Sequence, residues 1–152
     1  MDIVDKETRS RMMCGIRSAH TRPELQVRSL LHGCGFRFRL HDQKLPGKPD
    51  IVLRRHKAVA LVHGCFWHGH ARHLFRLPSS RPEFWRSKIA RNTANDAHVT
   101  MELLDNHWRV CVIWECALKG RMRLSPEVLS QRVRTWLLSN ERFCNIVEDA
   151  PS

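Results

Sequence analysis

The ten residues from 64 to 73, Gly-Cys-Phe-Trp-His-Gly-His-Ala-Arg-His, bring more chemically active side chains together than any other stretch of this 152-residue chain. They include one cysteine and three histidines, which are soft or borderline metal ligands, and two adjacent aromatic residues. A core strand would not contain so many imidazoles, and a flexible linker would not contain adjacent large aromatics. The segment therefore indicates a loop that handles a metal ion, a nucleic acid or both.

Cys65 and His70 in this loop, with Cys116 further along the chain, have the side chains of a structural zinc site. His73 is the available fourth ligand in the same loop. The alternative is that Cys65 and Cys116 are buried as small apolar residues, as free cysteines frequently are. The spacing leaves both interpretations open.

Asp50 follows a Pro46-Gly47 turn and begins a predicted strand, while the next predicted strand ends just before His63. Carboxylate oxygens at the mouth of a small sheet suit Mg²⁺, a hard cation that retains water ligands. His63 and His68 lie just beyond the second strand, and a neutral imidazole accepts protons readily near neutral pH. From the Pro49-Asp50 dipeptide alone, a turn cap is the simpler interpretation of Asp50.

Three aromatic residues, Phe66, Trp67 and Trp85, lie in or near this region. Apolar side chains next to cationic ones can insert between base pairs and stabilise unstacked DNA. The alternative is core packing, which we expect for Phe84 and Trp114. Adjacent aromatics in a histidine-rich loop are harder to place in a core.

Lys88, Asn92 and Asp96 are spaced four residues apart on a predicted helix, so they share one face. Such a polar ridge is usually solvated. The other interpretation is that it faces the same cleft as the histidine-rich loop.

The formal charge of +11 and the sequence pI of about 10.3 indicate a polyanionic partner, most commonly nucleic acid. A solvated basic surface is the alternative. The polar N-terminus and the absence of a long apolar run indicate neither a secretory signal nor a membrane span. The six cysteines are irregularly spaced, which favours reduced thiols in the cytoplasm over a disulfide framework.

Apolar periodicity and turn residues predict an α/β fold, with a small mixed sheet flanked by helices. The predicted helices cover 6–16, 21–33, 82–105 and 126–138. The predicted strands cover 36–40, 50–53, 58–62 and 110–114, with a basic hairpin at 54–57. No element is predicted after Asn140.

Thr21 and Glu24 have capping-box spacing, in which each side chain bonds the other residue's backbone N–H. The two apolar helix faces are expected to consist of Leu25, Leu30 and Leu31 in the helix at 21–33, and of Phe84, Ile89, Val99 and Leu103 in the helix at 82–105.

Taken together, the chain resembles the very short patch repair DNA mismatch endonucleases over nearly its whole length. The motifs that carry the resemblance are Asp5-Lys6-x-Thr8-Arg9-Ser10-x-Met12-Met13, Leu45-Pro46-Gly47-Lys48-Pro49-Asp50, His63-Gly64-Cys65-Phe66-Trp67-His68-Gly69-His70, Arg81-Pro82-Glu83-Phe84-Trp85, Lys88-Ile89-x-x-Asn92, and Trp108-Arg109-Val110 with Trp114-Glu115-Cys116-Ala117-Leu118. These enzymes have a restriction-endonuclease-like core of the PD-(D/E)xK type. They nick the thymine strand at T:G mismatches that arise from deamination of 5-methylcytosine.

The resemblance implies one mismatch endonuclease domain over 1–152, with a DNA-contacting arm at 1–20 and a tail at 141–152. It also implies a monomer that acts on double-stranded DNA in the bacterial cytoplasm, at the nucleoid, alongside other repair proteins and without a membrane partner.

The resemblance further implies roles for individual residues. Asp50 matches the Mg²⁺-binding aspartate, and Val62 would offer its backbone carbonyl to the same ion. His68 matches the imidazole that activates water. The accessory polar residues around the metal are His63, Glu24 and Asp96. The residues expected to contact DNA are Phe66, Trp67, Trp85, Lys88, Asn92 and Met13.

Cys65, His70 and Cys116 match zinc ligands of the family, whose remaining cysteine aligns with Arg72. Arginine cannot ligate a cation, so His73, one position further, is the expected substitute.

Two alternatives compete with this interpretation. A restriction-type nuclease of the same fold would cut both strands and would need no mismatch wedge. A non-catalytic DNA-binding module would have no use for Asp50 and His68.

Overall fold

The fold is taken from a computed structural model that describes residues 21–66, 68–70, 77 and 79–149. Within these ranges, one sheet of five strands has the order β1-β2-β3-β4-β5. The strands are β1 (Arg39–Leu40), β2 (Ile51–Leu53), β3 (Ala58–His63), β4 (Arg109–Trp114) and β5 (Phe143–Ile146). The pairs β1–β2 and β2–β3 are antiparallel, whereas β3–β4 and β4–β5 are parallel. The predicted mixed sheet is therefore confirmed.

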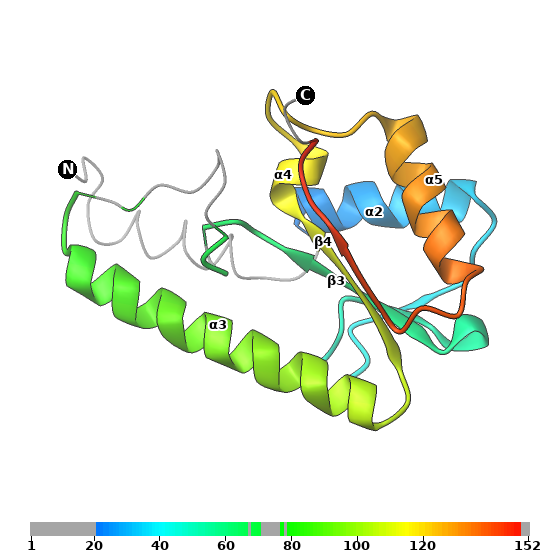
Figure 1. The fold of residues 1–152 in the computed structure, drawn as a ribbon, viewed down its shortest axis with the longest axis horizontal. Helices are drawn as coiled ribbons and strands as arrows, with labels where there is room; N and C mark the ends of the chain where they lie inside the picture. The colour runs from blue at the N-terminus through cyan, green and yellow to red at the C-terminus, as the bar shows by residue number, and fades with distance from the viewer. Residues whose placement is uncertain (1–20, 67, 71–76, 78, 150–152) are drawn as a thin grey trace.

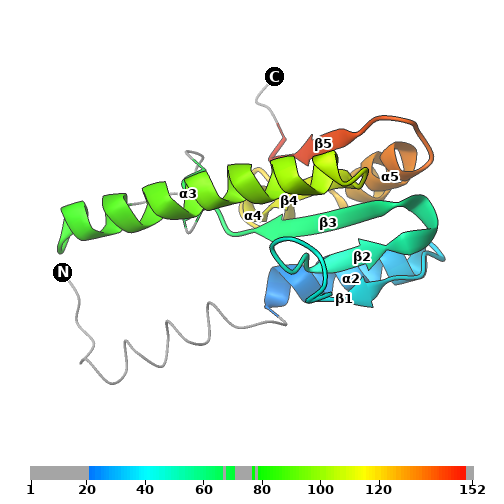
Figure 2. The same ribbon diagram turned by 90° about the horizontal axis from the view of Figure 1, so that it is seen from below.

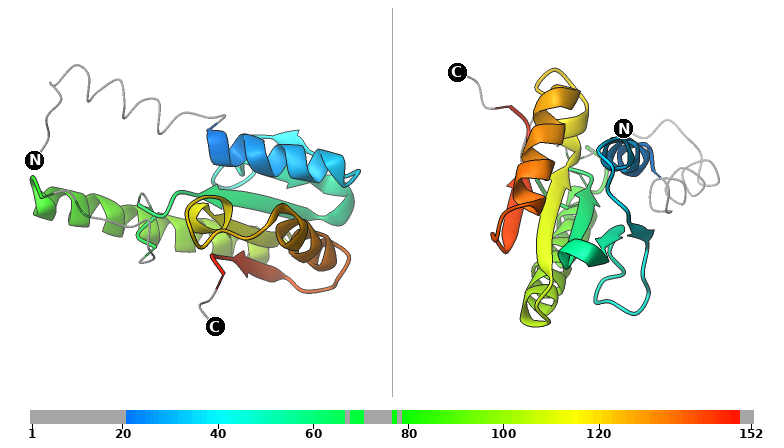
Figure 3. Two further views of the ribbon diagram at one scale, coloured as in Figure 1. Left: turned by 90° about the horizontal axis from the view of Figure 1, so that it is seen from above. Right: turned by 90° about the vertical axis from the view of Figure 1, so that its right-hand side faces the viewer.

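Helices cover both faces of this sheet (Figure 1). Helices α2 (Arg22–Gly33) and α5 (Pro126–Leu137) lie side by side on one face (Figure 3). The short α4 (Glu115–Leu118), which follows β4 in the chain, contacts α2. The long helix α3 (Pro82–Asp105) covers the other face. None of the helices in the described ranges is long and apolar enough to cross a membrane.

Alternating side chains of the strands build a separate core on each face. On the α2 and α5 side, strand residues such as Ile51 and Ile113 pack against Leu31 and Trp136. On the α3 side, strand residues pack around Leu103, which is fully buried. The continuous apolar runs of β3 and β4 thus reflect burial from both faces.

Local sequence signals account for the helix boundaries. The Thr21 hydroxyl accepts a hydrogen bond from the backbone N–H of Glu24, and the Ser125 hydroxyl accepts one from Val128. Proline occupies the first turn of α2, α3 and α5. The predicted capping box is only half formed, because the Glu24 carboxylate faces Arg28 and His41 instead of returning to Thr21.

Several element predictions were wrong. The strand predicted at 36–40 is paired only at Arg39–Leu40. The predicted hairpin at 54–57 does connect the antiparallel strands β2 and β3, and it contains a 3-10 turn, η1 (Arg54–His56). Strand β5 and helix α4 were missed. Strand β5 lies at the sheet edge with a single buried residue, Ile146, so it lacks a strong apolar pattern. The helix predicted at 6–16 lies outside the described residues.

Two residues predicted to be buried are exposed. Leu25 is 50% exposed because the buried side of α2 is formed by Val27 and Leu31. Phe84 is 39% exposed because the first turns of α3 extend beyond the end of the sheet (Figure 2). The guanidinium of Arg81 lies over the Phe84 ring, 4.7 Å from its centroid. Phe84 is therefore not part of the core stripe of α3.

Candidate active site at the strand ends

Most of the predicted site residues meet at one end of the sheet, close to α4 in Figure 1. Strands β3 and β4 are parallel, and their last paired residues are His63 and Trp114. Strand β2 runs the other way, so Asp50, just before its first residue, lies at the same end. This position is fixed directly, because an Asp50 carboxylate oxygen accepts a hydrogen bond from the Val62 N–H at 2.8 Å.

Asp50 is one member of a group of titratable side chains that also contains Glu24 and His41. The His41 ring lies between the two carboxylates, with Nε2 3.3 Å from Glu24 Oε2 and Nδ1 3.9 Å from Asp50 Oδ1. Arg28 Nη2 lies 3.2 Å from both Glu24 Oε2 and His41 Nε2. Arg28 thus bridges the Glu24 carboxylate and the His41 ring.

The electrostatics of Asp50 favour a bound cation. Burial raises the pKa of its carboxyl to about 6, the Val62 N–H lowers it, and the charge of Glu24 raises it. The buried Glu24 and the half-buried Asp50 repel one another, and a divalent cation would stabilise both carboxylates. Carboxylate oxygen suits a hard cation. The residues present therefore fit the predicted metal.

Sequence reasoning missed His41. It follows β1 with φ near 47°, and its N–H donates to the Asp50 carbonyl. His41 directly follows β1, and β1 pairs with β2, the strand that Asp50 precedes. This position in the sequence could have predicted that His41 lies near Asp50.

A second group consists of His63, His68 and Asp96. His68 Nδ1 is hydrogen-bonded to the Asp96 carboxylate, which comes from α3. The His63 ring stacks on the His68 ring with centroids 3.9 Å apart and planes 7° apart. Since the lone pairs of an imidazole lie in its ring plane, stacked rings do not converge on one ion. This group is therefore better suited to handling a proton than to holding a metal.

The buried environment of His63 fixes its charge. Burial, followed by the neighbouring His68, lowers the pKa of His63 to about 3, so His63 is neutral at physiological pH. The charge of His68 also lowers the pKa of Asp50, against the larger effect of burial. The group that contains Asp50 and the group that contains His68 are thus close enough for charge in one to shift a pKa in the other.

The loop that contains His68 packs closely against α3. The Thr93 hydroxyl donates to the His68 carbonyl at 3.3 Å. At Gly69, which has φ of +65°, an added Cβ would lie 2.8 Å from the Ile89 side chain. Asp96 projects toward this loop, so that end of the predicted polar ridge faces the site. Lys88 and Asn92, on the same side of α3, are half-buried.

A third group contains Cys65, His70 and Cys116, whose donor atoms lie within 4.8 Å of one another. Both sulfurs are buried, at 3.5 Å and 3.7 Å from His70 Nδ1. Burial, and then the neighbouring Cys116, raises the pKa of the Cys65 thiol to about 12. Two thiols and an imidazole that converge in a buried place fit a zinc ion. The fourth predicted ligand, His73, and Arg72 lie outside the described residues.

Two of the three aromatic residues predicted to insert into DNA, Phe66 and Trp85, lie close together. Phe66 and Trp85 lie with ring centroids 5.5 Å apart, and Trp85 is half-buried beside Phe84. Trp67 and Met13 lie outside the described residues.

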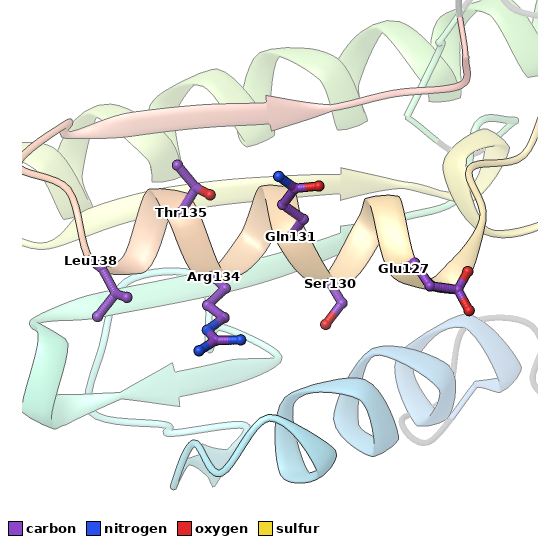
Figure 4. A pocket seen from close by; sticks show the side chains of 6 residues that line it. All are labelled: Glu127, Ser130, Gln131, Arg134, Thr135 and Leu138. Atoms are coloured by element: carbon purple, nitrogen blue, oxygen red, sulfur yellow. The ribbon is translucent and has the colours of Figure 1, made fainter.

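A pocket along α5 is separate from this site. Figure 4 shows the side chains that line it: Glu127, Ser130, Gln131, Arg134, Thr135 and Leu138. None of the predicted site residues lines this pocket.

A mixed sheet with carboxylates and an imidazole–carboxylate pair at one end fits the class of metal-dependent nucleases. The family model for the DNA mismatch endonuclease Vsr matches residues 1–74. The chain is 43% identical over 136 residues to the DNA mismatch endonuclease Vsr of Escherichia coli K12, covering 90% of this chain and 87% of that protein. The chain therefore belongs to the Vsr family of DNA mismatch endonucleases, and it is a DNA endonuclease.

Two further relatives are named nicking enzymes. The chain is 47% identical to the type II nicking enzyme V.XorIIP of Xanthomonas oryzae pv. oryzae, over 80% of this chain and 94% of that protein. It is 41% identical to V.NmeAIP of Neisseria meningitidis, over 88% and 94%. The predicted family and enzyme class are confirmed.

Proposed function

We propose that the enzyme is a Mg²⁺-dependent endonuclease that nicks the thymine strand at T:G mismatches left by deamination of 5-methylcytosine, and so initiates very short patch repair. The observation that carries this proposal is the meeting of Asp50 and Glu24 with the His68–Asp96 pair at one end of the sheet. Membership in the mismatch endonuclease family supports the choice of substrate.

The metal would be held by Asp50, with the backbone carbonyl of Val62 as a second donor and Glu24 as a nearby negative charge. When bound, Mg²⁺ neutralises charge on the scissile phosphate and polarises a water molecule. The Val62 N–H is hydrogen-bonded to one Asp50 oxygen at 2.8 Å, so the other oxygen would be available to bind the cation.

His68 is the general base in this proposal. Its Nδ1 is occupied by Asp96, so Nε2 is the nitrogen that accepts a proton from the attacking water. The Asp96 carboxylate fixes the ring orientation and stabilises the imidazolium that forms. His63 stays neutral and excludes water from one face of the His68 ring.

Mismatch selectivity would come from the aromatic wedge, Phe66, Trp67 and Trp85. A T:G pair is easier to unstack than a matched pair, and inserted apolar rings exploit that difference. Lys88, Asn92, Met13 and the basic arm at 1–20 would contact the DNA around it. The charge of +11 supports a large phosphate contribution to affinity.

A structural zinc would be held by Cys65, His70, Cys116 and, in place of the ligand that Arg72 cannot supply, His73. It would tie the loop that carries Phe66 and His68 to the end of β4. The chain would act as a single-domain monomer over 1–152 in the bacterial cytoplasm, at the nucleoid, alongside other repair proteins. The nicking relatives support cleavage of one strand.

The test is a strand-resolved nicking assay on a T:G duplex with either strand labelled, in the presence of Mg²⁺. We expect cleavage of the thymine strand only, with little cleavage of the C:G and T:A controls and none in a chelator. Cleavage of both strands, or equal cleavage of matched duplexes, would contradict the proposal. A panel of flanking sequences then defines the sequence preference.

A further inference from the structure

Trp114, the last residue of β4, lies between the cysteine–histidine group and the imidazole group. One face of its indole stacks on His70, with centroids 4.1 Å apart and planes 21° apart. The same indole makes an edge contact with His63, at 5.2 Å and 76°. It thus touches one member of each group.

These contacts continue without a break to α3. His63 stacks on His68 at 3.9 Å, and His68 is hydrogen-bonded to Asp96. Four rings, His70, Trp114, His63 and His68, therefore form a continuous series, which we call the ring series. It connects the cysteine–histidine group to the carboxylate that orients His68.

The indole is anchored at its outer edge. Trp114 Nε1 donates a hydrogen bond to the side-chain oxygen of Asn145 at 2.7 Å. Asn145 belongs to β5, the strand that runs parallel to β4 at the sheet edge. Because β4 and β5 are joined by backbone hydrogen bonds, the indole cannot slide along the imidazoles without breaking this bond.

His63, in the middle of the ring series, depends on such packing. Its Nδ1 is buried and has no hydrogen-bond partner among the described residues. Rotation of the His63 ring is therefore restrained by the rings on either side, Trp114 and His68. If the Trp114 indole were displaced, the His63 ring and the His68 ring stacked on it would be free to tilt.

We propose that Trp114, anchored by Asn145, is a positioning residue that sets the orientation of His63 and His68 for strand cleavage. The inference rests on the proposed function, because it takes His68 as the general base. Neither Trp114 nor Asn145 contacts the reacting atoms. Their effect is to hold the imidazole within the narrow range of positions that proton transfer requires.

The experiment measures single-turnover nicking of a T:G duplex at saturating enzyme, together with duplex affinity, zinc content and melting temperature. Trp114→Leu should lower the nicking rate by ~10²-fold, as expected for a misplaced catalytic group. Trp114→Phe and Asn145→Ala should each lower it on the order of tenfold, and the double variant should be no slower than either, because both remove one hydrogen bond. Affinity and zinc content should stay at the wild-type level.

Rescue and a matched control separate positioning from folding. Asn145→Asp retains the acceptor oxygen and should restore most of the rate lost in Asn145→Ala. Trp108, which packs in the same core at the opposite end of β4, provides the control. Trp108→Phe should nick at the wild-type rate.

The inference would be overturned if Trp114→Leu nicks at the wild-type rate. It would also be overturned if the nicking rates of the variants fall in proportion to their duplex affinity, zinc content or thermal stability. A failure of Asn145→Asp to restore activity would overturn it as well. If the wild-type enzyme does not nick the T:G duplex, or His68→Ala nicks normally, the proposed function itself fails. The positioning role alone would be refuted if the wild-type enzyme nicks normally, His68→Ala is inactive and the Trp114 variants are fully active.

Discussion

At the scale of single residues, the two nitrogens of His68 have different environments. Nδ1 is bound to the Asp96 carboxylate, and in the proposed mechanism the opposite nitrogen accepts a proton from water. A carboxylate in this position fixes both the tautomer and the ring orientation. His68 and Asp96 should therefore act as one catalytic unit, although they are 28 residues apart in sequence.

We expect His68→Ala to slow single-turnover nicking by ~10²–10⁴-fold, the usual contribution of a positioned base. Asp96→Asn should cause a smaller loss, and it should cause no further loss when His68 is already alanine, because the two residues serve one step. A loss below about tenfold in a folded His68→Ala protein would make His68 a structural or phosphate contact.

Glu24 and His41 show where residue patterns mislead. Thr21 and Glu24 have the spacing of a capping box, and the Thr21 half does form. The Glu24 side chain instead meets Arg28, one turn further along α2, and His41, which folding brings from the end of β1. Sequence spacing describes a helix end in isolation and cannot include a partner that arrives from another element.

At the scale of elements, the site depends on a loop held tightly against a helix. Gly69 adopts φ of +65° where a side chain would lie 2.8 Å from Ile89 and 3.0 Å from Thr93. Both the conformation and the close approach require glycine. The contact holds the His68 backbone next to α3, the helix that supplies Asp96.

Gly69→Ala should therefore reduce nicking strongly while most of the fold remains, because the loop must move away from α3. The matched control is Gly33→Ala, since Gly33 has open space around it and no positive φ. Nicking rates and melting temperatures of both variants measure the effect. Equal, near wild-type nicking in the two variants would show that the loop does not need this contact.

The cysteine–histidine group joins the same loop to α4, which begins with Glu115 and Cys116. Elemental analysis of protein purified in metal-free buffer should find about one zinc per chain, the stoichiometry of one structural site. Zinc should be lost in Cys116→Ala, weakened in His73→Ala and retained in Cys111→Ala, a buried cysteine outside the group. Normal nicking by a zinc-free protein would show that packing alone holds the loop.

The elements that sequence predicted well are those whose signals are local. Proline at the start of α3, hydroxyl caps on α2 and α5, and the apolar runs of β3 and β4 all act over a few residues. Strand β5 and the exposure of Phe84 depend instead on where the sheet ends. The position of a sheet edge is a property of the assembled fold, which no local pattern contains.

At the scale of the whole molecule, the formal charge of +11 is the strongest physical indication of the partner. Cationic side chains that meet DNA phosphates release condensed counterions, and this makes affinity fall with salt. Charge attracts the enzyme to DNA of any sequence, so the proposed mismatch selectivity would have to come from the site at the sheet end.

The affinity for a T:G duplex should fall linearly with salt concentration on a double-logarithmic plot. A matched duplex should show a similar slope with weaker absolute affinity, since the phosphate contacts are shared. Fluorescence anisotropy over a range of NaCl concentrations measures both slopes. A flat plot would contradict a role for the basic surface in DNA binding.

The family could be identified from sequence because its motifs are long and occur in order. The three groups of side chains could not be assembled in the same way. Asp50 precedes β2, His68 lies in a loop and Asp96 lies in α3. Their convergence depends on the antiparallel β2–β3 pair and on the packing of α3. The sequence predicted the participants, whereas the fold determines which of them make contact.

The most direct test of the account is whether cutting can be separated from binding at Asp50. Asp50→Asn keeps the side-chain size and an oxygen that can accept from Val62, so the fold and the affinity for a T:G duplex should be retained, while nicking in Mg²⁺ should be abolished because the charged metal ligand is lost. Retained affinity with no detectable nick is the predicted result. Nicking at the wild-type rate by this variant would remove Asp50 from the mechanism and contradict the proposed site.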